Sequence, residues 1–262
     1  MKPSHIIFLL FFLSLLGCQQ QAETERDNPT KPLIESQNFD SMTEEGWVAS
    51  SKIDFVYDES NQPIEEIAYA TKGGDAIPSF RTLKSYDEAG NLERSVRERW
   101  INETWTFGMR SAYIYNQGKI IQRIDSVAGS NARVTFITYR YDDKGRLETE
   151  LGLRSVEGNM VNQSKVNYQY DERDLAIQKE WPRWSGDDWI NSRKMALIYN
   201  DAGHHIQTIR YNWTDEQWVE SINYTLQVDE SGTRLSELWQ RPGESGPEEF
   251  TRVTYTYKQE SD

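Results

Sequence analysis

The chain has 262 residues, of which 37% are hydrophobic and 12% aromatic, and its formal net charge is −13. The aromatic content disfavours disorder, and the length is sufficient for one or two domains with a sizeable core. The acidic balance excludes an electrostatic attraction to nucleic-acid backbones or to anionic lipid. No nucleic-acid partner is therefore expected, and any membrane association must come from covalent lipid.

Residues 1–18 have the organisation of a lipoprotein signal peptide. Lys2 precedes a run at residues 6–16 that is apolar except for Ser14, which is too short to span a bilayer as a helix but suits a signal sequence. The Leu-Leu-Gly-Cys motif that ends at Cys18 resembles the lipobox of bacterial lipoproteins. This resemblance implies cleavage before Cys18 and attachment of several acyl chains there, palmitate among them, which together hold a protein stably on a membrane.

Residues 19–45 are polar and acidic, contain two prolines and show little periodicity. Such a composition predicts a disordered tether. No aspartate directly follows Cys18, which by the same resemblance favours the outer membrane over the inner one. The expected location is the cell envelope, with the domain facing either the periplasm or the outside.

Residues 46–258 repeat a pattern in which a tyrosine precedes Asp or Asn. The intervals between successive copies are 29 residues, with one of 26. The repeated positions, which we call the anchor positions, are Tyr57, Tyr86, Tyr115, Tyr141, Tyr170 and Tyr199, and the series continues imperfectly at Val228, which replaces the tyrosine, and at Tyr257, which precedes a lysine.

Each anchor position opens a predicted turn. Asp87 followed by Gly90 is typical of a type I turn closed by a left-handed glycine, which often connects hairpin strands. These acids lack the alternating spacing of a calcium loop, so we expect turn chemistry rather than a metal site. The sequence predicts no metal and no cofactor.

A second kind of turn lies between paired tryptophans. Trp100 and Trp105 flank four residues, and the same spacing recurs at Trp184–Trp189 and Trp213–Trp218. This spacing predicts a hairpin loop with an aromatic pair facing across the strands. One repeat is then two strands and two turns.

Within the predicted strands, apolar side chains occupy every second position, as in Ile53, Phe55 and Tyr57. This alternation predicts an all-β meander of about 14–15 antiparallel strands, with the anchor tyrosines and the tryptophan pairs on one face. A flat sheet would expose far more apolar surface than soluble proteins leave bare. A closed barrel of this strand number would enclose a channel too wide for side chains to fill. We therefore expect a twisted, curled open sheet, with a closed up-and-down barrel as the alternative.

These features resemble the Tyr-Asp (YD, or RHS-type) repeats of bacterial surface and secreted proteins, in the Trp-rich version found in lipoproteins of Bacteroidota. The resemblance covers residues 47 to about 258. Large members build a shell around a toxin cargo, but this chain has too few repeats for a shell and no room for cargo after Tyr257.

The expected function is a non-enzymatic surface scaffold or binding module, whose partner is a polysaccharide or another envelope protein. Glycan binding through exposed aromatic residues is the alternative, with Trp181, Trp184 and Trp239 as the candidate residues because they lie near turns. The mature chain has two histidines, His204 and His205, adjacent in a predicted solvated turn, and no G-x-S-x-G motif. No catalytic residue is predicted.

Overall fold

The computed structural model describes residues 32–129 and 132–258, so the predicted signal peptide 1–18 and Cys18 lie outside the described residues. The described secondary structure consists of sixteen strands. They are β1 (Ile34–Thr43), β2 (Gly46–Tyr57), β3 (Pro63–Lys72), β4 (Asp75–Tyr86), β5 (Leu92–Ile101), β6 (Thr104–Asn116), β7 (Lys119–Val127), β8 (Arg133–Tyr141), β9 (Leu147–Val156), β10 (Asn159–Tyr170), β11 (Ala176–Trp184), β12 (Trp189–Tyr199), β13 (His205–Thr214), β14 (Gln217–Val228), β15 (Arg234–Gly243) and β16 (Gly246–Tyr257).

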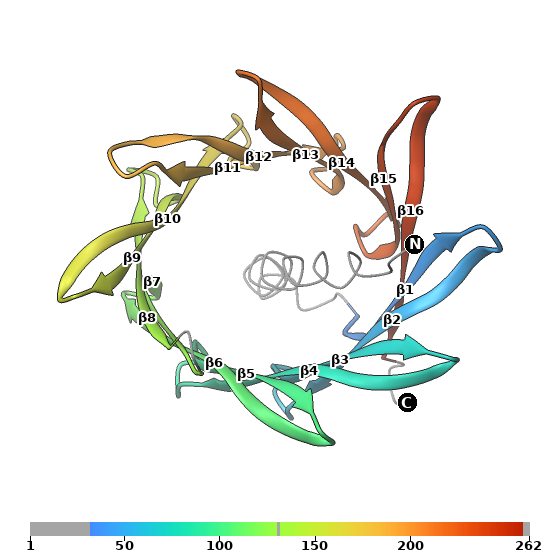
Figure 1. The fold of residues 1–262 in the computed structure, drawn as a ribbon, viewed down its shortest axis with the longest axis horizontal. Helices are drawn as coiled ribbons and strands as arrows, with labels where there is room; N and C mark the ends of the chain where they lie inside the picture. Colours follow the sequence, from blue (N-terminus) through green and yellow to red (C-terminus); the bar gives the residue numbers. More distant parts are fainter. Residues whose placement is uncertain (1–31, 130–131, 259–262) are drawn as a thin grey trace.

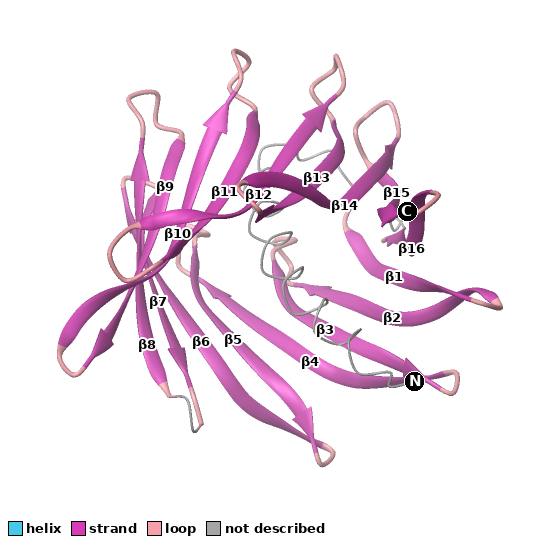
Figure 2. Cartoon of the chain, turned by 45° about the horizontal axis from the view of Figure 1, so that its top comes forward, coloured by secondary structure: helices cyan, strands magenta, loops and turns pink. Residues whose placement is uncertain are grey.

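The strands form a closed antiparallel barrel in which every strand pairs with its neighbours in the chain and β1 pairs with β16 (Figure 1). The oblique view in Figure 2 shows the same continuous wall. The expectation of an open sheet of 14–15 strands was therefore wrong, and the alternative of a closed up-and-down barrel is the observed fold. In the described part of the chain, no helix has the length and apolarity that crossing a membrane requires.

Strand β1 lies inside the range 19–45 that the sequence assigned to the tether, so the barrel begins at Ile34 rather than at residue 46. Although β1 has a polar composition, it forms a strand because it is hydrogen-bonded to a neighbouring strand on each side. Phe39 faces Val253 of β16 and Ser51 of β2. Because β1 supplies the partner for β16, it removes both free edges of the sheet, which would otherwise invite pairing with other chains.

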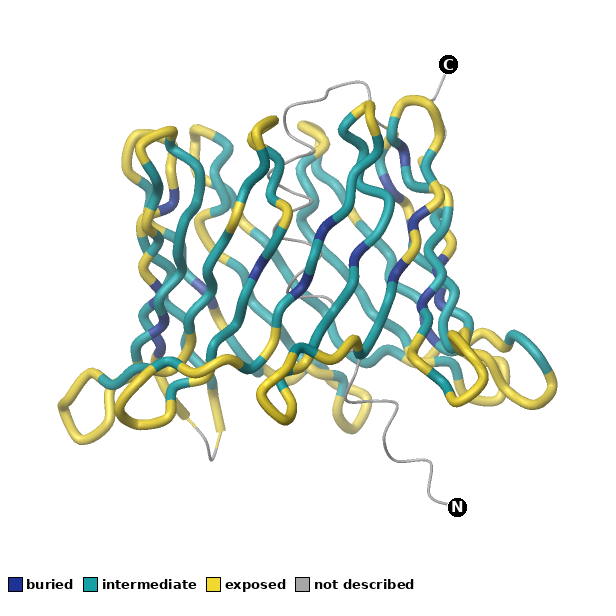
Figure 3. The backbone as a smooth tube through the Cα atoms, turned by 90° about the horizontal axis from the view of Figure 1, so that it is seen from above, coloured by how far each residue is buried: buried dark blue, intermediate teal, exposed yellow. Residues whose placement is uncertain are grey.

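The two faces of the barrel wall differ in burial. Figure 3 shows that buried residues lie on the strands, whereas the turns and hairpin ends are exposed. On the face that carries the anchor tyrosines, Leu226 is buried and Val253 is only 1% exposed, whereas their neighbours Thr225 and Thr254 on the other face are exposed. In a single-layer barrel, side chains crowd together on the concave side. The anchor face is therefore the inner wall, and the opposite face is the outer wall.

The inner wall is polar enough to border water. Lys84 forms an ion pair with Glu66, and Arg123 lies 3.0 Å from Asp125. The expectation of an open sheet rested on an apolar lumen that would gain nothing from closure. Because this wall carries charged groups, the argument against a closed barrel no longer applies, since a wide barrel can enclose an aqueous interior.

The anchor tyrosines tie the end of one strand to the beginning of the strand before it. The hydroxyl of Tyr86 donates a hydrogen bond to the carbonyl oxygen of Pro63 at 2.7 Å, and that of Tyr170 to Leu147 at 2.8 Å. The same bond recurs 23 residues apart at Tyr57, Tyr115, Tyr199 and Tyr257, and 21 residues apart at Tyr141.

The predicted turns after the anchor positions are confirmed. Gly90 has a φ of 79°, and its amide donates to the carbonyl of Asp87 at 2.9 Å. The Asp87 carboxylate accepts a further bond from the amide of Asn91. We call the end of the barrel formed by these turns the Asp-turn rim. Since the Lys258 amide donates to the carbonyl of Leu33, the described chain enters and leaves the barrel at this rim.

A β-bulge interrupts nearly every second strand, seven residues before its anchor position. Ser50 is the extra residue of β2, Gly108 that of β6 and Ser221 that of β14. The hydroxyl of Ser50 donates to the carbonyl of Phe39 on the partner strand. Because bulges bend and twist a strand, the hairpins beyond them splay away from the barrel (Figures 1 and 3).

The bulges also overturn one sequence expectation. Each extra residue shifts the alternation by one position, so the tryptophan pairs lie on the outer wall, not on the face of the anchor tyrosines. The predicted cross-strand pairing itself is confirmed: the rings of Trp100 and Trp105 meet edge-on with centroids 4.9 Å apart. Their loop has two residues, Asn102 and Glu103, both with positive φ, as in a type I′ turn.

We expect Tyr170→Phe to lower the free energy of unfolding by about 1 kcal/mol, because the hydrogen bond to Leu147 is lost while the ring remains. Urea unfolding followed by tryptophan fluorescence measures this change. Tyr69→Phe is the matched control, since Tyr69 lies on the outer wall. Equal stabilities for Tyr170→Phe and the wild type would contradict the structural role of the anchor hydroxyl.

Candidate functional site

Trp239, one of the three predicted sugar-binding aromatic residues, is packed into the barrel wall. It is 4% exposed and meets the rings of Phe39, Tyr224 and Phe250 at centroid distances of 5.0–6.2 Å. Its indole nitrogen donates to Glu237 at 3.0 Å. The prediction of an exposed ring was therefore wrong for Trp239, because closure through β1 brings Phe39 onto it.

Trp184 belongs to a structural pair on the outer wall, where its ring lies 5.2 Å from that of Trp189. Tryptophans of this series also receive a cation from two strands away, with a basic nitrogen or guanidinium carbon 4.7–6.0 Å from the ring centroid. The pairs are Arg81 with Trp105, Lys165 with Trp189, Lys194 with Trp218, and Arg252 with Trp47 across the closing strands. These cation–π contacts join neighbouring hairpins.

Trp181 occupies a different environment. It lies on the inner wall directly opposite Arg193, in the row that continues to Asn212. These residues, with Met195 and Arg210, line a recess of about 180 Å³. Of the three predicted aromatic residues, Trp181 is the one that lines a recess together with polar groups able to bind a ligand.

Two guanidinium groups share this recess. Burial lowers the pKa of Arg210, and the positive charge of Arg193 adds to that effect, while Tyr224 opposes it. Within the described part of the chain, the buried Nε of Arg210 and the buried hydroxyl of Tyr224 have no hydrogen-bond partner. The guanidinium carbon of Arg210 lies 5.0 Å from the centroid of the Tyr224 ring. This pair could not be predicted from the sequence, since Arg193 and Arg210 come together only through the register of β12 and β13.

The sequence predicted that His205 is a solvated turn residue, and this prediction was wrong. His205 begins β13 on the inner wall, where its Nε2 contacts the carbonyl of Gln207 at 3.0 Å and the hydroxyl of Thr208 at 2.8 Å. Burial, reinforced by the charge of Arg234, lowers the pKa of His205 to about 4. The imidazole is therefore neutral at pH 7.

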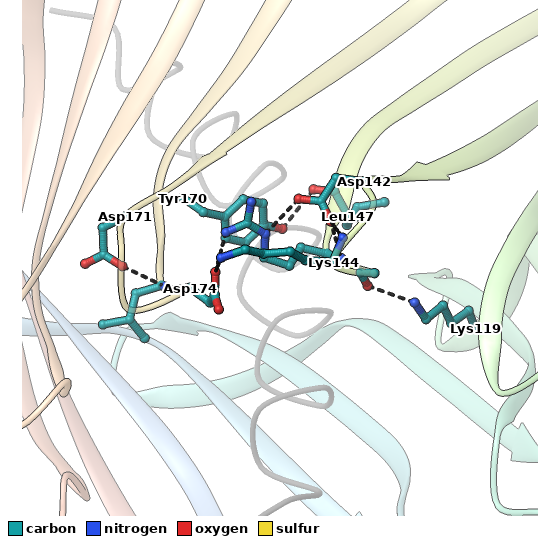
Figure 4. Close-up of polar contacts among 10 residues, drawn as sticks. Lys119, Asp142, Lys144, Leu147, Tyr170, Asp171 and Asp174 are labelled. Atoms are coloured by element: carbon teal, nitrogen blue, oxygen red, sulfur yellow. Dashed lines mark hydrogen bonds and ion pairs between the residues drawn. The ribbon is translucent and has the colours of Figure 1, made fainter.

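Charged side chains join adjacent turns along the Asp-turn rim (Figure 4). Lys144 lies 2.9 Å from Asp174 in the next turn, and Lys119 donates to the carbonyl of Gly145 at 3.0 Å. The hydrogen bond from Lys144 is the main cause of a lowered pKa of Asp174. Across residues 32–129 and 132–258, no three His, Cys, Asp or Glu side chains are grouped so that they could hold a metal. The rim carboxylates thus serve turns and ion pairs.

The fold has counterparts among solved structures. A porin-like protein from Bacteroides uniformis shares 12% identity and a TM-score of 0.53, with 87% of this chain and 98% of that chain covered. A porin-like protein from Bacteroides vulgatus shares 8% identity and a TM-score of 0.35, with 87% and 99% covered. No protein-family model matches the chain, and no curated protein matches it. The likeness to the first structure concerns the fold alone.

The proposed relationship to YD (RHS-type) repeat proteins is not supported. A TcdB2-TccC3 structure shares 11% identity and a TM-score of 0.35, and the match covers 14% of that chain. The full-length likeness is instead to a porin-like barrel. The Tyr-Asp pattern misled because local chemistry explains it: the tyrosine bonds a distant carbonyl, and the aspartate caps a type I turn.

We expect acid to destabilise the barrel through His205. The unfolded state takes up a proton near pH 6.5 and the folded state only near pH 4, so stability falls as the pH drops between these values. The full difference is on the order of 3 kcal/mol. Unfolding midpoints at pH 7 and pH 4.5 should differ less for His205→Gln than for the wild type, with His204→Gln as the control. The same pH dependence in wild type and His205→Gln would exclude His205 as the cause.

Proposed function

We propose that this chain is a lipid-anchored outer-membrane protein whose barrel stands in water and acts as a non-enzymatic binding module. The observation that carries the proposal is the charge of the outer wall. Five residues before six of the anchor positions, the outward residue is basic. These residues are Lys52, Arg81, Arg110, Lys165, Lys194 and Arg252.

Ion pairs accompany these basic residues. Lys52 lies 2.7 Å from Asp54, and Arg252 lies 2.6 Å from Asp40. On the lipid face of a transmembrane barrel, a central Arg or Lys costs roughly 2–4 kcal/mol. Six such residues, together with outward carboxylates, suit an aqueous surface. The fold of a porin therefore does not require this barrel to be inserted as one.

The lipobox at Cys18 supplies the membrane attachment that the outer wall does not. Because β1 begins at the Asp-turn rim, the tether joins the barrel there. The splayed hairpins lie at the opposite end (Figure 3), and the tryptophan pairs belong to these hairpins. The likeness to a porin-like protein of Bacteroides agrees with an outer-membrane address.

A binding role fits the groups on the barrel better than a catalytic one. The histidine with a perturbed pKa, His205, is packed against Tyr199 and Thr208. The carboxylates of the inner wall serve ion pairs and tyrosine hydroxyls, as with Glu66 and Glu237. Of the three aromatic residues predicted to bind glycan, Trp181 is the one that the recess favours.

We expect Cys18→Ser to move the protein from the membrane fraction, where detergent is needed to extract it, to the soluble fraction. The physical reason is that the acyl chains are the only strong attraction to the bilayer. Cell fractionation followed by immunoblotting measures this shift, with Gln19→Ser as a control that keeps the thiol. If Cys18→Ser still required detergent for extraction, the strands themselves would be in contact with lipid, and the proposal would be wrong.

A further inference from the structure

The inner wall carries an excess of positive charge although the chain as a whole is acidic. Counting the described strand residues between the Asp-turn rim and the splayed hairpins, ten are basic and four acidic, which leaves an excess of six. The basic residues are Lys84, Arg97, Arg99, Arg123, Arg133, Arg154, Lys179, Arg193, Arg210 and Arg234, and the acidic ones are Glu66, Asp125, Glu150 and Glu237.

This distribution makes the lumen attractive to anions. A concave surface with low-dielectric walls focuses the field of the charges that line it. The compensating acids of the chain, which has a net charge of −13, are therefore concentrated elsewhere, in turns, hairpins and the outer wall. All four inner acids are already engaged: Glu66 by Lys84, Asp125 by Arg123, Glu150 by Tyr168 and Glu237 by Tyr255.

The recess at Trp181 concentrates this excess at one place. Arg193 and Arg210 lie close enough for the charge of one to lower the pKa of the other. No carboxylate is among the described residues that line the recess. An anion placed beside Arg210 would supply an acceptor for its buried Nε, and the positive charge of Arg193 would add to the attraction.

We propose that the Trp181 recess binds a carboxylate-bearing sugar of an acidic polysaccharide, an inference that rests on the barrel being a binding module. The indole of Trp181 stacks on the apolar face of the sugar ring. The guanidinium groups of Arg193 and Arg210 bind the carboxylate, for which their planar donors are suited. The amide of Asn212, in the same row, is placed for the hydroxyl groups.

The aromatic complement favours a sugar over single-stranded nucleic acid. Proteins that bind single strands provide several aromatic platforms on which successive bases stack. Two aromatic residues line this recess, and the ring of one of them, Tyr211, has the Lys194 nitrogen 5.2 Å from its centroid, which leaves the indole of Trp181 as the platform. The rings of Trp184 and Trp239 are occupied by Trp189 and Phe39.

The test measures binding of a short oligogalacturonate by isothermal calorimetry, using the full chain in a neutral detergent. The wild type should bind the acidic oligomer at least tenfold more tightly than a neutral galactose oligomer, and the affinity should fall as salt rises. Arg193→Gln and Arg210→Gln should each weaken binding about tenfold, because each removes a charged hydrogen-bond donor. Trp181→Leu should weaken binding of the acidic oligomer and leave its salt dependence unchanged.

Arg110→Gln is the matched control, since it removes the same charge from the outer wall and should leave the affinity unchanged. Circular dichroism establishes that each variant is folded. Arg193→Lys adds a variant that keeps the charge but not the planar fork, and it should also bind more weakly than the wild type.

Absence of binding to the acidic oligomer would overturn the proposal, and so would an equal loss of affinity in Arg110→Gln. Equally tight binding of a DNA oligonucleotide, with no effect of Trp181→Leu, would make the wall a general polyanion surface and overturn the assignment to a sugar. None of these results would alter the fractionation of Cys18→Ser, so failure of this inference is distinguishable from failure of the membrane attachment.

Discussion

The pairing of β1 with β16 is the constraint on which the rest of the structure depends. It leaves no free edge, and it fixes which face of the sheet is concave. Side chains two strands apart then converge on the inner wall, as shown by the 6.2 Å between the rings of Phe39 in β1 and Trp239 in β15. Without this ladder Trp239 would be an exposed ring, and the charges of the inner wall would belong to a bare surface.

The β-bulges divide the aromatic residues between two tasks. Between a bulge and the Asp-turn rim, tyrosines point inward and tie strand ends together through their hydroxyls. Between a bulge and the tip of its hairpin, tryptophans point outward and join neighbouring hairpins through basic residues such as Lys194. One extra residue per repeat thus gives a single alternating pattern two functions, and it also bends the hairpins away from the barrel.

The features that local chemistry determines could be predicted from the sequence. The period of 29 residues, the turn from Asp87 to Gly90 and the pairing of Trp100 with Trp105 all depend on residues close together in the chain. Closure could not be predicted, because β1 precedes the first anchor position and has a polar composition. The outward direction of the tryptophans could not be predicted either. A bulge residue such as Ser50 or Gly108 occurs in nearly every repeat, so it is part of the regular spacing between tryptophan and tyrosine and cannot be recognised as an extra residue.

The candidate site was predictable in one member, Trp181, and not in the others, because Arg193 and Arg210 become neighbours only through the register of β12 and β13. Their arrangement opposes stability. Burial and the positive charge of Arg193 both oppose the charged form of Arg210, and the buried Nε of Arg210 has no acceptor. Other groups of the inner wall are paired, as Lys84 is with Glu66, but the buried hydroxyls of Ser51 and Tyr139 also lack a hydrogen-bond partner among the described residues. Unsatisfied polar groups are expected where a sequence binds something, and at Arg210 such a group borders the recess that Trp181 lines.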